Sequence, residues 1–147
     1  MSHHVWIDKD LLRSDTFRSL KGKSWLVYLD FLRRRQWHRV KHKSRSDSYV
    51  ITNNGEITYS YKEAEMKGIS KVQFRNAVDD LQAKGLIDIR EYGSGGHNRK
   101  QTKYFIDDRW RKYGTPEFLP PRKLRKKNNK DGQGWAAYHA KKKKTSV

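Results

Sequence analysis

The stretch 60-SYKEAEMKGISKVQFRNAVDDLQAKGLIDIREYGSGGHNRKQTKY-104 decides the fold of this chain. Two pairs of residues in it, Ser60 with Glu63 and Ser70 with Gln73, have the spacing of a capping box. In that motif a serine oxygen accepts a hydrogen bond from a backbone N–H of the first helical turn, and the side chain three residues on accepts one from the serine N–H. The stretch therefore predicts two helix starts close together.

A glycine separates the two predicted helices. Gly68 suits the left-handed backbone with which many helices end, so we expect one helix over residues 61–67 and a second over 71–84, ended by Gly85. The second helix has an apolar stripe at helical spacing, made of Phe74, Ala77 or Val78, and Leu81. Two short helices joined by a tight turn form a helix-turn-helix arrangement.

A β-hairpin with a basic tip is expected next. Residues 87–92 alternate between apolar and polar side chains as a half-buried strand does, and residues 102–106 form the returning strand. The glycine-rich loop 93–101 between them is not followed by a helix and has no Walker-type Gly-Lys-Ser/Thr, so a nucleotide site is disfavoured. Its Arg99 and Lys100 suit contact with a phosphate or entry into a minor groove.

Two helical segments are expected before residue 60. Residues 8–20 form a short lead-in with Asp15 as a candidate internal cap. Residues 23–37 form the first core helix, in which a broad apolar face recurs at helical spacing. The apolar positions of that face are Trp25, Leu26, Tyr28, Leu29, Phe31 and Leu32.

A basic, polar segment follows at residues 38–47, and we expect an exposed loop there. The loop is either a solvated connection or a phosphate-contacting element that uses Lys41, Lys43 and Arg45. The sequence leaves these two readings open.

Asn54-Gly55 is a strong turn signal. The β-type residues at 49–51 and 56–59 on either side predict a hairpin or a single short strand. Ile57 and Tyr59 are expected to point into the core.

The charge of the chain favours a polyanionic partner. Its 147 residues hold 34 Lys and Arg against 16 Asp and Glu, a formal net charge of +18, which makes nucleic acid the first candidate. An anionic membrane surface is the second, but no apolar run approaches the about 18 residues that span a bilayer, and no signal peptide is recognised. We expect no membrane partner and a soluble, cytoplasmic protein that is nucleoid-associated when bound to DNA. The absence of cysteine excludes disulfides and Cys-based zinc sites.

The distribution of charge and apolar residues separates a tail from the rest of the chain. We expect a flexible N-terminus at residues 1–7, a domain at 8–119 and a basic tail at 120–147. The tail holds ten Lys and Arg with Asp131 as its one acidic residue, and few aliphatic side chains. It is therefore expected to be disordered or extended.

The expected order is helix, strand, helix, turn, helix and then a basic-tipped hairpin. This order, with the turn Gly68-Ile69-Ser70 and the run Leu81-Gln-Ala-Lys-Gly85-Leu86-Ile87, resembles winged helix-turn-helix domains of bacterial regulators and of phage or plasmid replication proteins. The resemblance implies an α+β fold with a three-helix core and a small antiparallel sheet. It also implies a recognition helix over residues 70–84 and a wing over 93–101.

Binding of duplex DNA through that helix and wing, by a regulator or a replication or mobile-element accessory factor, is the function that the resemblance implies. Arginine, asparagine and valine near the helix start can meet guanine, adenine and a thymine methyl group. Asp79 and Asp80 come later, so only the first half of the helix is expected to enter a groove. The candidate nucleic-acid-binding residues are Ser70, Lys71, Val72, Gln73, Arg75 and Asn76 in the helix, Arg99 and Lys100 in the wing, Lys41, Lys43 and Arg45 in the loop, and Lys141, Lys142, Lys143 and Lys144 in the tail.

Two other functions stay open. An RNA-binding or ribosome-associated structural protein would use the basic tail, with Trp135 and Tyr138 stacking on unpaired bases. A protein-interaction adaptor would use the wing face. A homodimer is compatible with each of these functions.

Catalysis is not expected. His38, His42 and His97 have no Asp, Glu or Ser nearby at a spacing typical of a catalytic triad or a metal site. We therefore predict no enzyme activity, no cofactor and no metal.

Overall fold

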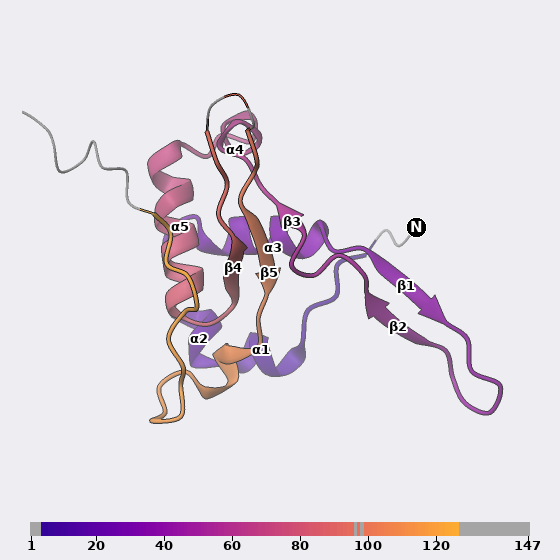
Figure 1. Ribbon diagram of the computed structural model, residues 1–147. Coiled ribbons are helices and arrows are strands. Elements are labelled where there is room, and N and C mark those ends of the chain that lie inside the picture. Colours follow the sequence, from indigo (N-terminus) through magenta and orange to yellow (C-terminus); the bar gives the residue numbers. More distant parts are fainter. Residues whose placement is uncertain (1–3, 96, 98, 127–147) are drawn as a thin grey trace, which may run out of the picture.

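Five α-helices and two small antiparallel sheets make up an α+β fold in residues 4–95, 97 and 99–126, which the computed structural model describes (Figure 1). The helices are α1 (Lys9–Arg13), α2 (Asp15–Arg18), α3 (Ser24–Arg33), α4 (Tyr61–Met66) and α5 (Lys71–Ala83). The strands are β1 (Trp37–Val40), β2 (Ser48–Ile51), β3 (Ile57–Thr58), β4 (Ile87–Glu91) and β5 (Lys103–Ile106), and a 3-10 helix, η1, covers Arg109–Lys112.

The larger sheet has the strand order β3-β5-β4. Ile57 of β3 and Ile89 of β4 both lie opposite Tyr104 of the central strand β5. The predicted β4–β5 hairpin is confirmed, and the turn at Asn54-Gly55 leads into the single short strand β3. Asn54 itself binds the end of β5, because its amide donates to the carbonyl of Ile106 and accepts from the Ile106 N–H at 3.1 and 2.7 Å.

The smaller sheet corrects two expectations. Helix α3 ends at Arg33, not near Trp37, and the segment expected to be a loop begins with strand β1, which pairs along its whole length with β2. Strand β2 therefore has its partner before it in the chain, while the residues after Gly55 pair with β5. Backbone atoms of Gln36 hold the base of this hairpin: its carbonyl accepts from the Thr52 N–H at 2.9 Å, and its N–H donates to the Asn53 side chain at 2.8 Å.

The core lies where α3, α5 and the larger sheet meet. Tyr59 is at its centre, with its ring 5.4 Å from that of Phe31 and 4.8 Å from that of Phe74. Ile57 and Tyr59 are buried as predicted, as is the α5 stripe, which includes both Ala77 and Val78. The expected apolar face of α3 is only partly buried, because Trp25, Leu26 and Leu29 keep 38–42% exposure.

The predicted helix boundaries around α4 and α5 are confirmed to within one residue. Ser70 and Gln73 form the complete capping box, whereas Ser60 accepts from the Glu63 N–H while its hydroxyl donates to the Glu63 carboxylate. Gly68 has φ +80°, as the end of α4 requires. Near the N-terminus the cap is Ser14 in place of Asp15, because the Ser14 oxygen accepts from the Phe17 N–H.

Asp80 joins the second half of α5 to the start of α3. Its carboxylate accepts hydrogen bonds from the Ser24 hydroxyl at 2.7 Å and the Lys21 N–H at 2.9 Å, and pairs with the Lys84 ammonium at 2.7 Å. The Lys84 ammonium also donates to the carbonyl of Ser19. This charge network ties the second half of α5 to the residues that lead into α3.

Residues 118–126, here named the C-terminal segment, run alongside α5 (Figure 1). An alternating half-buried strand would leave Asp88 of β4 facing solvent, but Asp88 is fully buried beneath this segment and accepts from the Arg122 N–H at 2.8 Å. Gln82 of α5 donates to the carbonyl of Lys123 at 2.7 Å. The described residues beyond 119 therefore lie against the core, while residues 127–147 are outside the described part of the chain.

Candidate nucleic-acid interface

The first turns of α5 present a small open surface. Lys71, Val72 and Asn76 are exposed, Val72 to 57%, and Arg75 is half-buried. This end of α5 lies at the end of the molecule that also carries α4 and the outer ends of β4 and β5 (Figure 1). The start of α5 and the β4–β5 loop therefore share one end of the molecule.

Two of the predicted readers are occupied within the protein. The Ser70 oxygen accepts from the Gln73 N–H at 3.1 Å, and the Gln73 side-chain oxygen accepts from the Ser70 N–H at 3.0 Å. Both atoms therefore serve the cap of α5. The exposed side chains that remain for base or phosphate contact at the start of α5 include those of Lys71, Val72 and Asn76.

The β4–β5 loop is closed by two backbone hydrogen bonds. Ser94 and Lys100 donate to each other's carbonyls at 2.9 and 3.1 Å, and the exposed Arg99 and Lys100 lie at this point of the loop. The loop residues 96 and 98 are outside the described part of the chain. The hairpin backbone thus sets the positions from which the two predicted wing cations extend.

A pocket of about 350 Å³ lies between this loop, the start of α4 and the C-terminal segment. Its walls combine aromatic rings with cations: Tyr61, Phe74, Tyr92, Lys100, Arg125 and Lys126. The Tyr61 ring packs edge-on against Phe74 at 5.4 Å, and the Lys126 ammonium lies 4.6 Å from the centre of the Tyr92 ring. The pocket joins the β4–β5 loop to the start of α4 and the C-terminal segment, and α5 contributes the buried Phe74 to its lining. Asn76 lines a separate hollow beside Lys21 and Lys23.

The acidic half of α5 is neutralised by contacts within the chain. The Arg125 guanidinium binds both oxygens of Asp79, at 2.9 and 3.0 Å, and Asp80 pairs with Lys84. Bidentate pairs of this kind are among the stronger charged hydrogen bonds. The carboxylates that would repel a phosphate backbone are thus paired with cations, and the C-terminal segment lies over that half of the helix.

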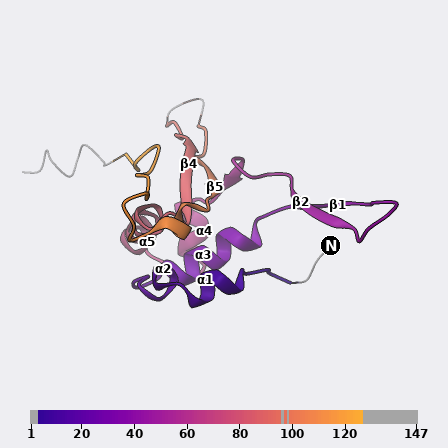
Figure 2. The same ribbon diagram turned by 90° about the horizontal axis from the view of Figure 1, so that it is seen from below.

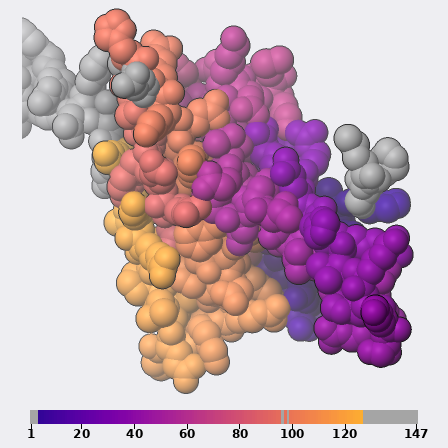
Figure 3. All heavy atoms as spheres, turned by 45° about the vertical axis from the view of Figure 1, so that its right-hand side comes forward, coloured from indigo at the N-terminus to yellow at the C-terminus, as the bar shows by residue number. Residues whose placement is uncertain are grey.

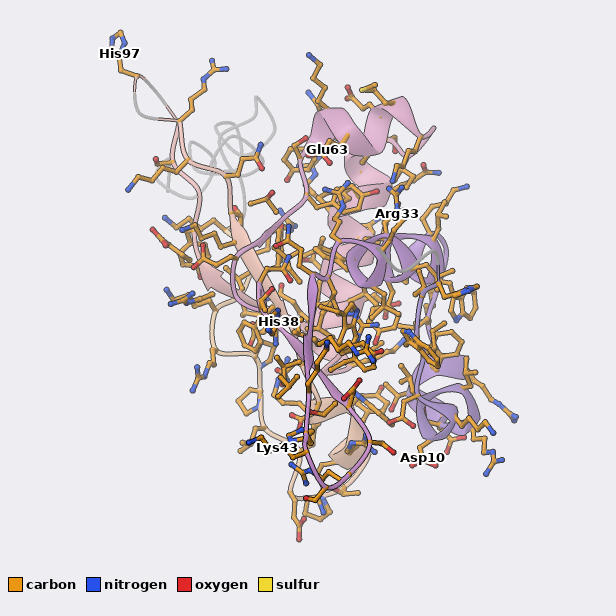
Figure 4. The ribbon with its side chains drawn as sticks, turned by 90° about the vertical axis from the view of Figure 1, so that its right-hand side faces the viewer. Asp10, Arg33, His38, Lys43, Glu63 and His97 are labelled. Carbon is orange, nitrogen blue, oxygen red and sulfur yellow. The ribbon has the colours of Figure 1, made fainter. Side chains whose placement is uncertain are left out.

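The predicted loop cations are not brought together with these elements. Lys41, Lys43 and Arg45 lie at the far end of the β1–β2 hairpin, which projects from the body on its own (Figures 1 and 2). Figure 4 shows Lys43 and His97, at the tips of the two hairpins, at opposite ends of the molecule. Lys141 to Lys144 lie outside the described residues.

Sequence reasoning missed Arg125, Lys126, Tyr61 and Tyr92 as members of this surface. Arg125 and Lys126 belong to a stretch whose composition predicts a tail, and contacts with Asp88, Gln82 and Asp79 hold that stretch against the core. A polar residue at an alternating strand position gives no sign that it will be covered.

Neither a metal centre nor a membrane span occurs in the described residues. They contain no group of three or more His, Asp or Glu side chains that could hold a metal ion. They also contain no helix of the length and apolarity needed to cross a membrane.

No protein-family model, curated protein or solved structure matches this chain. Its function is therefore inferred from the surface described above, through the positions, exposure and charge of the side chains on it.

Proposed function

We propose that this protein is a winged helix-turn-helix protein that binds duplex DNA. The first half of α5 would enter the major groove, and the β4–β5 loop would lie on the adjacent backbone or minor groove. The observation that carries the proposal is that the open start of α5 lies at the same end of the molecule as α4 and the β4–β5 loop, which carries the exposed Arg99 and Lys100. A role as a regulator or as a replication or mobile-element accessory factor follows as part of the same proposal.

The contacts divide into two chemical kinds. Lys71 at the start of α5 and Lys100 in the loop supply ammonium groups, which suit phosphates and carry no sequence information. Asn76 supplies an amide that can bind adenine through two hydrogen bonds, and Val72 supplies an apolar surface for a thymine methyl group. Affinity and sequence preference are therefore assigned to different side chains of one surface.

The C-terminal segment supports this docking mode. It lies over the second half of α5 through the Arg125–Asp79 and Gln82–Lys123 contacts, so a helix lying flat along the groove would have to displace it. Because Arg125 binds both oxygens of Asp79, this carboxylate of α5 is already paired within the protein. The open half of the helix is left as the part that meets DNA.

The experiment begins with selection of bound sequences from a random duplex pool. Binding of the preferred duplex is then compared with that of an unrelated duplex. Asn76→Ala should weaken binding to the preferred site by roughly 1 to 3 kcal/mol, with a smaller effect on the unrelated duplex. Equal losses on both duplexes would reassign Asn76 to the backbone.

A matched pair of lysines tests the phosphate contacts. Lys71 and Lys9 are both exposed and both occupy the first residue of a helix, α5 and α1. Lys71→Ala should lower affinity on every duplex and reduce the log-log salt slope by about 0.9, whereas Lys9→Ala should leave both unchanged. If the two variants behave alike, or if RNA of the same length displaces the duplex, the proposed duplex site is wrong.

A further inference from the structure

The β1–β2 hairpin is a second exposed surface, separate from the one assigned to duplex DNA. It contributes no residue to the buried core, and both of its faces are largely open to solvent. Figure 3 shows it as a projection from the body, away from the β4–β5 hairpin. A two-stranded ribbon is at best marginally stable by itself, so this element is suited to gain stability from a partner.

The register of the hairpin puts aromatic and cationic side chains on one face. Trp37 pairs with Ile51 and Arg39 pairs with Tyr49, and side chains directly opposite or two residues apart share a face of a sheet. Trp37, Arg39, Tyr49 and Ile51 therefore form one face, here named the aromatic face. His38, Val40, Ser48 and Val50 form the other.

The side chains of the aromatic face are available to a ligand. Tyr49 is 60% exposed and Trp37 is 38% exposed, and the two lie diagonally across the ribbon. The Arg35 guanidinium stacks on the Trp37 ring at 4.9 Å and is itself held by the carbonyl of Trp6 at 2.7 Å. Trp37 is thus fixed in place by a cation while more than a third of its surface stays open.

The charged residues around the aromatic face favour a polyanionic ligand. Asp47 is bound to Arg39 at 2.6 Å, so the acidic group of the hairpin is neutralised within it. The loop beyond the strands carries Lys41, Lys43 and Arg45, all exposed. A partner must therefore offer both flat apolar groups and a row of negative charge.

We propose that the aromatic face is a stacking platform for the unpaired bases of single-stranded DNA, with the loop cations on its phosphates. Aromatic side chains set in a positive surface are how proteins bind single strands without reading their sequence. The bases of an intact duplex are stacked on one another and cannot use such a face. The choice of DNA over RNA rests on the proposed function, in which the same molecule binds a duplex, so that the two surfaces together suit DNA that is partly opened.

The test compares two exposed side chains on opposite faces of strand β2. Tyr49→Ala should weaken binding of a thymine-only DNA strand by roughly 10-fold or more, because the stacking of one base is removed. Val50→Ala, which truncates the 46% exposed neighbour on the other face, should leave that affinity unchanged. An abasic strand with the same phosphates should bind both variants and the original protein equally.

Duplex binding is measured in parallel with the same proteins. Tyr49→Ala should not change it, and Lys71→Ala should lower duplex binding alone, so failure of the proposed duplex site is distinguishable from failure of the platform. Equal effects of Tyr49→Ala and Val50→Ala, or an equal loss on the abasic strand, would overturn the platform. Tighter binding of a uracil-only RNA strand would overturn the choice of DNA, and self-association abolished by Tyr49→Ala would assign the face to a second copy of the chain.

Discussion

Asp30 is the residue at which α3, the strand end before α4 and the turn after α4 meet. Its carboxylate accepts a hydrogen bond from the Tyr59 hydroxyl at 2.6 Å and pairs with the Lys67 ammonium at 2.9 Å. Burial would raise the pKa of the Asp30 carboxyl, but the hydrogen bonds from Tyr59 and Lys67 outweigh burial and hold that pKa below its usual value of 3.8. The ionised carboxylate therefore stabilises the arrangement that orients α5.

The lowered pKa of Asp30 predicts a specific pH dependence of stability. The stabilisation is present above the unfolded pKa of about 4 and is lost as the pH falls through the lower folded pKa. Asp30→Asn should lower the free energy of unfolding by about 1 to 3 kcal/mol near neutral pH, and the difference from the original protein should shrink in acid. Urea unfolding across this pH range measures the effect, with the exposed Glu65→Gln as control. A difference that stays constant down to the lowest pH would contradict this role.

Polar residues that become buried were the hardest to predict from the sequence. Asp88 lies in a strand whose alternation is correct for Ile87 and Ile89, yet it is as buried as they are. Its burial depends on the backbone N–H of Arg122, which lies 34 residues later in the chain. Local patterns carry no signal for such a contact, because the periodicity of a strand reports one face only.

At the scale of elements, the sequence predicts best where the signals are local. The caps at Ser60 and Ser70, with Gly68 between them, locate α4 and α5 because each signal acts within one helical turn. The pairing of β1 with β2 was missed, since Asn54-Gly55 is a strong turn signal that here joins strands of two different sheets. Turn residues specify a reversal of the chain, whereas strand partners are decided by the side chains that pack.

The two glycines that end α4 and α5 provide a prediction at this scale. Gly68 and Gly85 both have φ +80°, but a Cβ on Gly68 would meet nothing within 4 Å, whereas one on Gly85 would lie 2.6 Å from the Trp110 nitrogen. Gly68→Ala should cost about 1 kcal/mol of backbone strain. Gly85→Ala should cost about 3 kcal/mol or more, because η1 must also move. Thermal or urea unfolding measures both, and equal losses would show that η1 yields without cost.

At the scale of the whole molecule, positive charge is spread over separate surfaces. The start of α5 and the β4–β5 loop share one end, the β1–β2 hairpin carries its own cations, and the C-terminal segment uses Arg125 to neutralise Asp79. The net charge of +18 predicts a polyanionic partner. It does not tell on which surfaces the cations lie, so it could not predict that they are spread over separate surfaces. The proposed duplex site and the proposed stacking platform would thus lie at different points of the molecule.

The anchoring of the C-terminal segment sharpens a test of the remaining tail. Residues 127–147 contain six lysines with Asp131 as their acidic residue, and removing them leaves the contacts of Arg122 and Arg125 in place. Deletion of 127–147 should therefore flatten the log-log salt slope of duplex binding, by about 0.9 for each phosphate that is no longer neutralised, while stability and sequence preference stay unchanged. Deletion of 120–147 should in addition destabilise the domain, because Asp88 would lose the Arg122 N–H and its cover. Salt titrations and urea unfolding of the two truncations separate these effects. An unchanged slope in the shorter deletion would exclude the tail from DNA binding, and equal stability of both truncations would show that Asp88 does not need the segment above it.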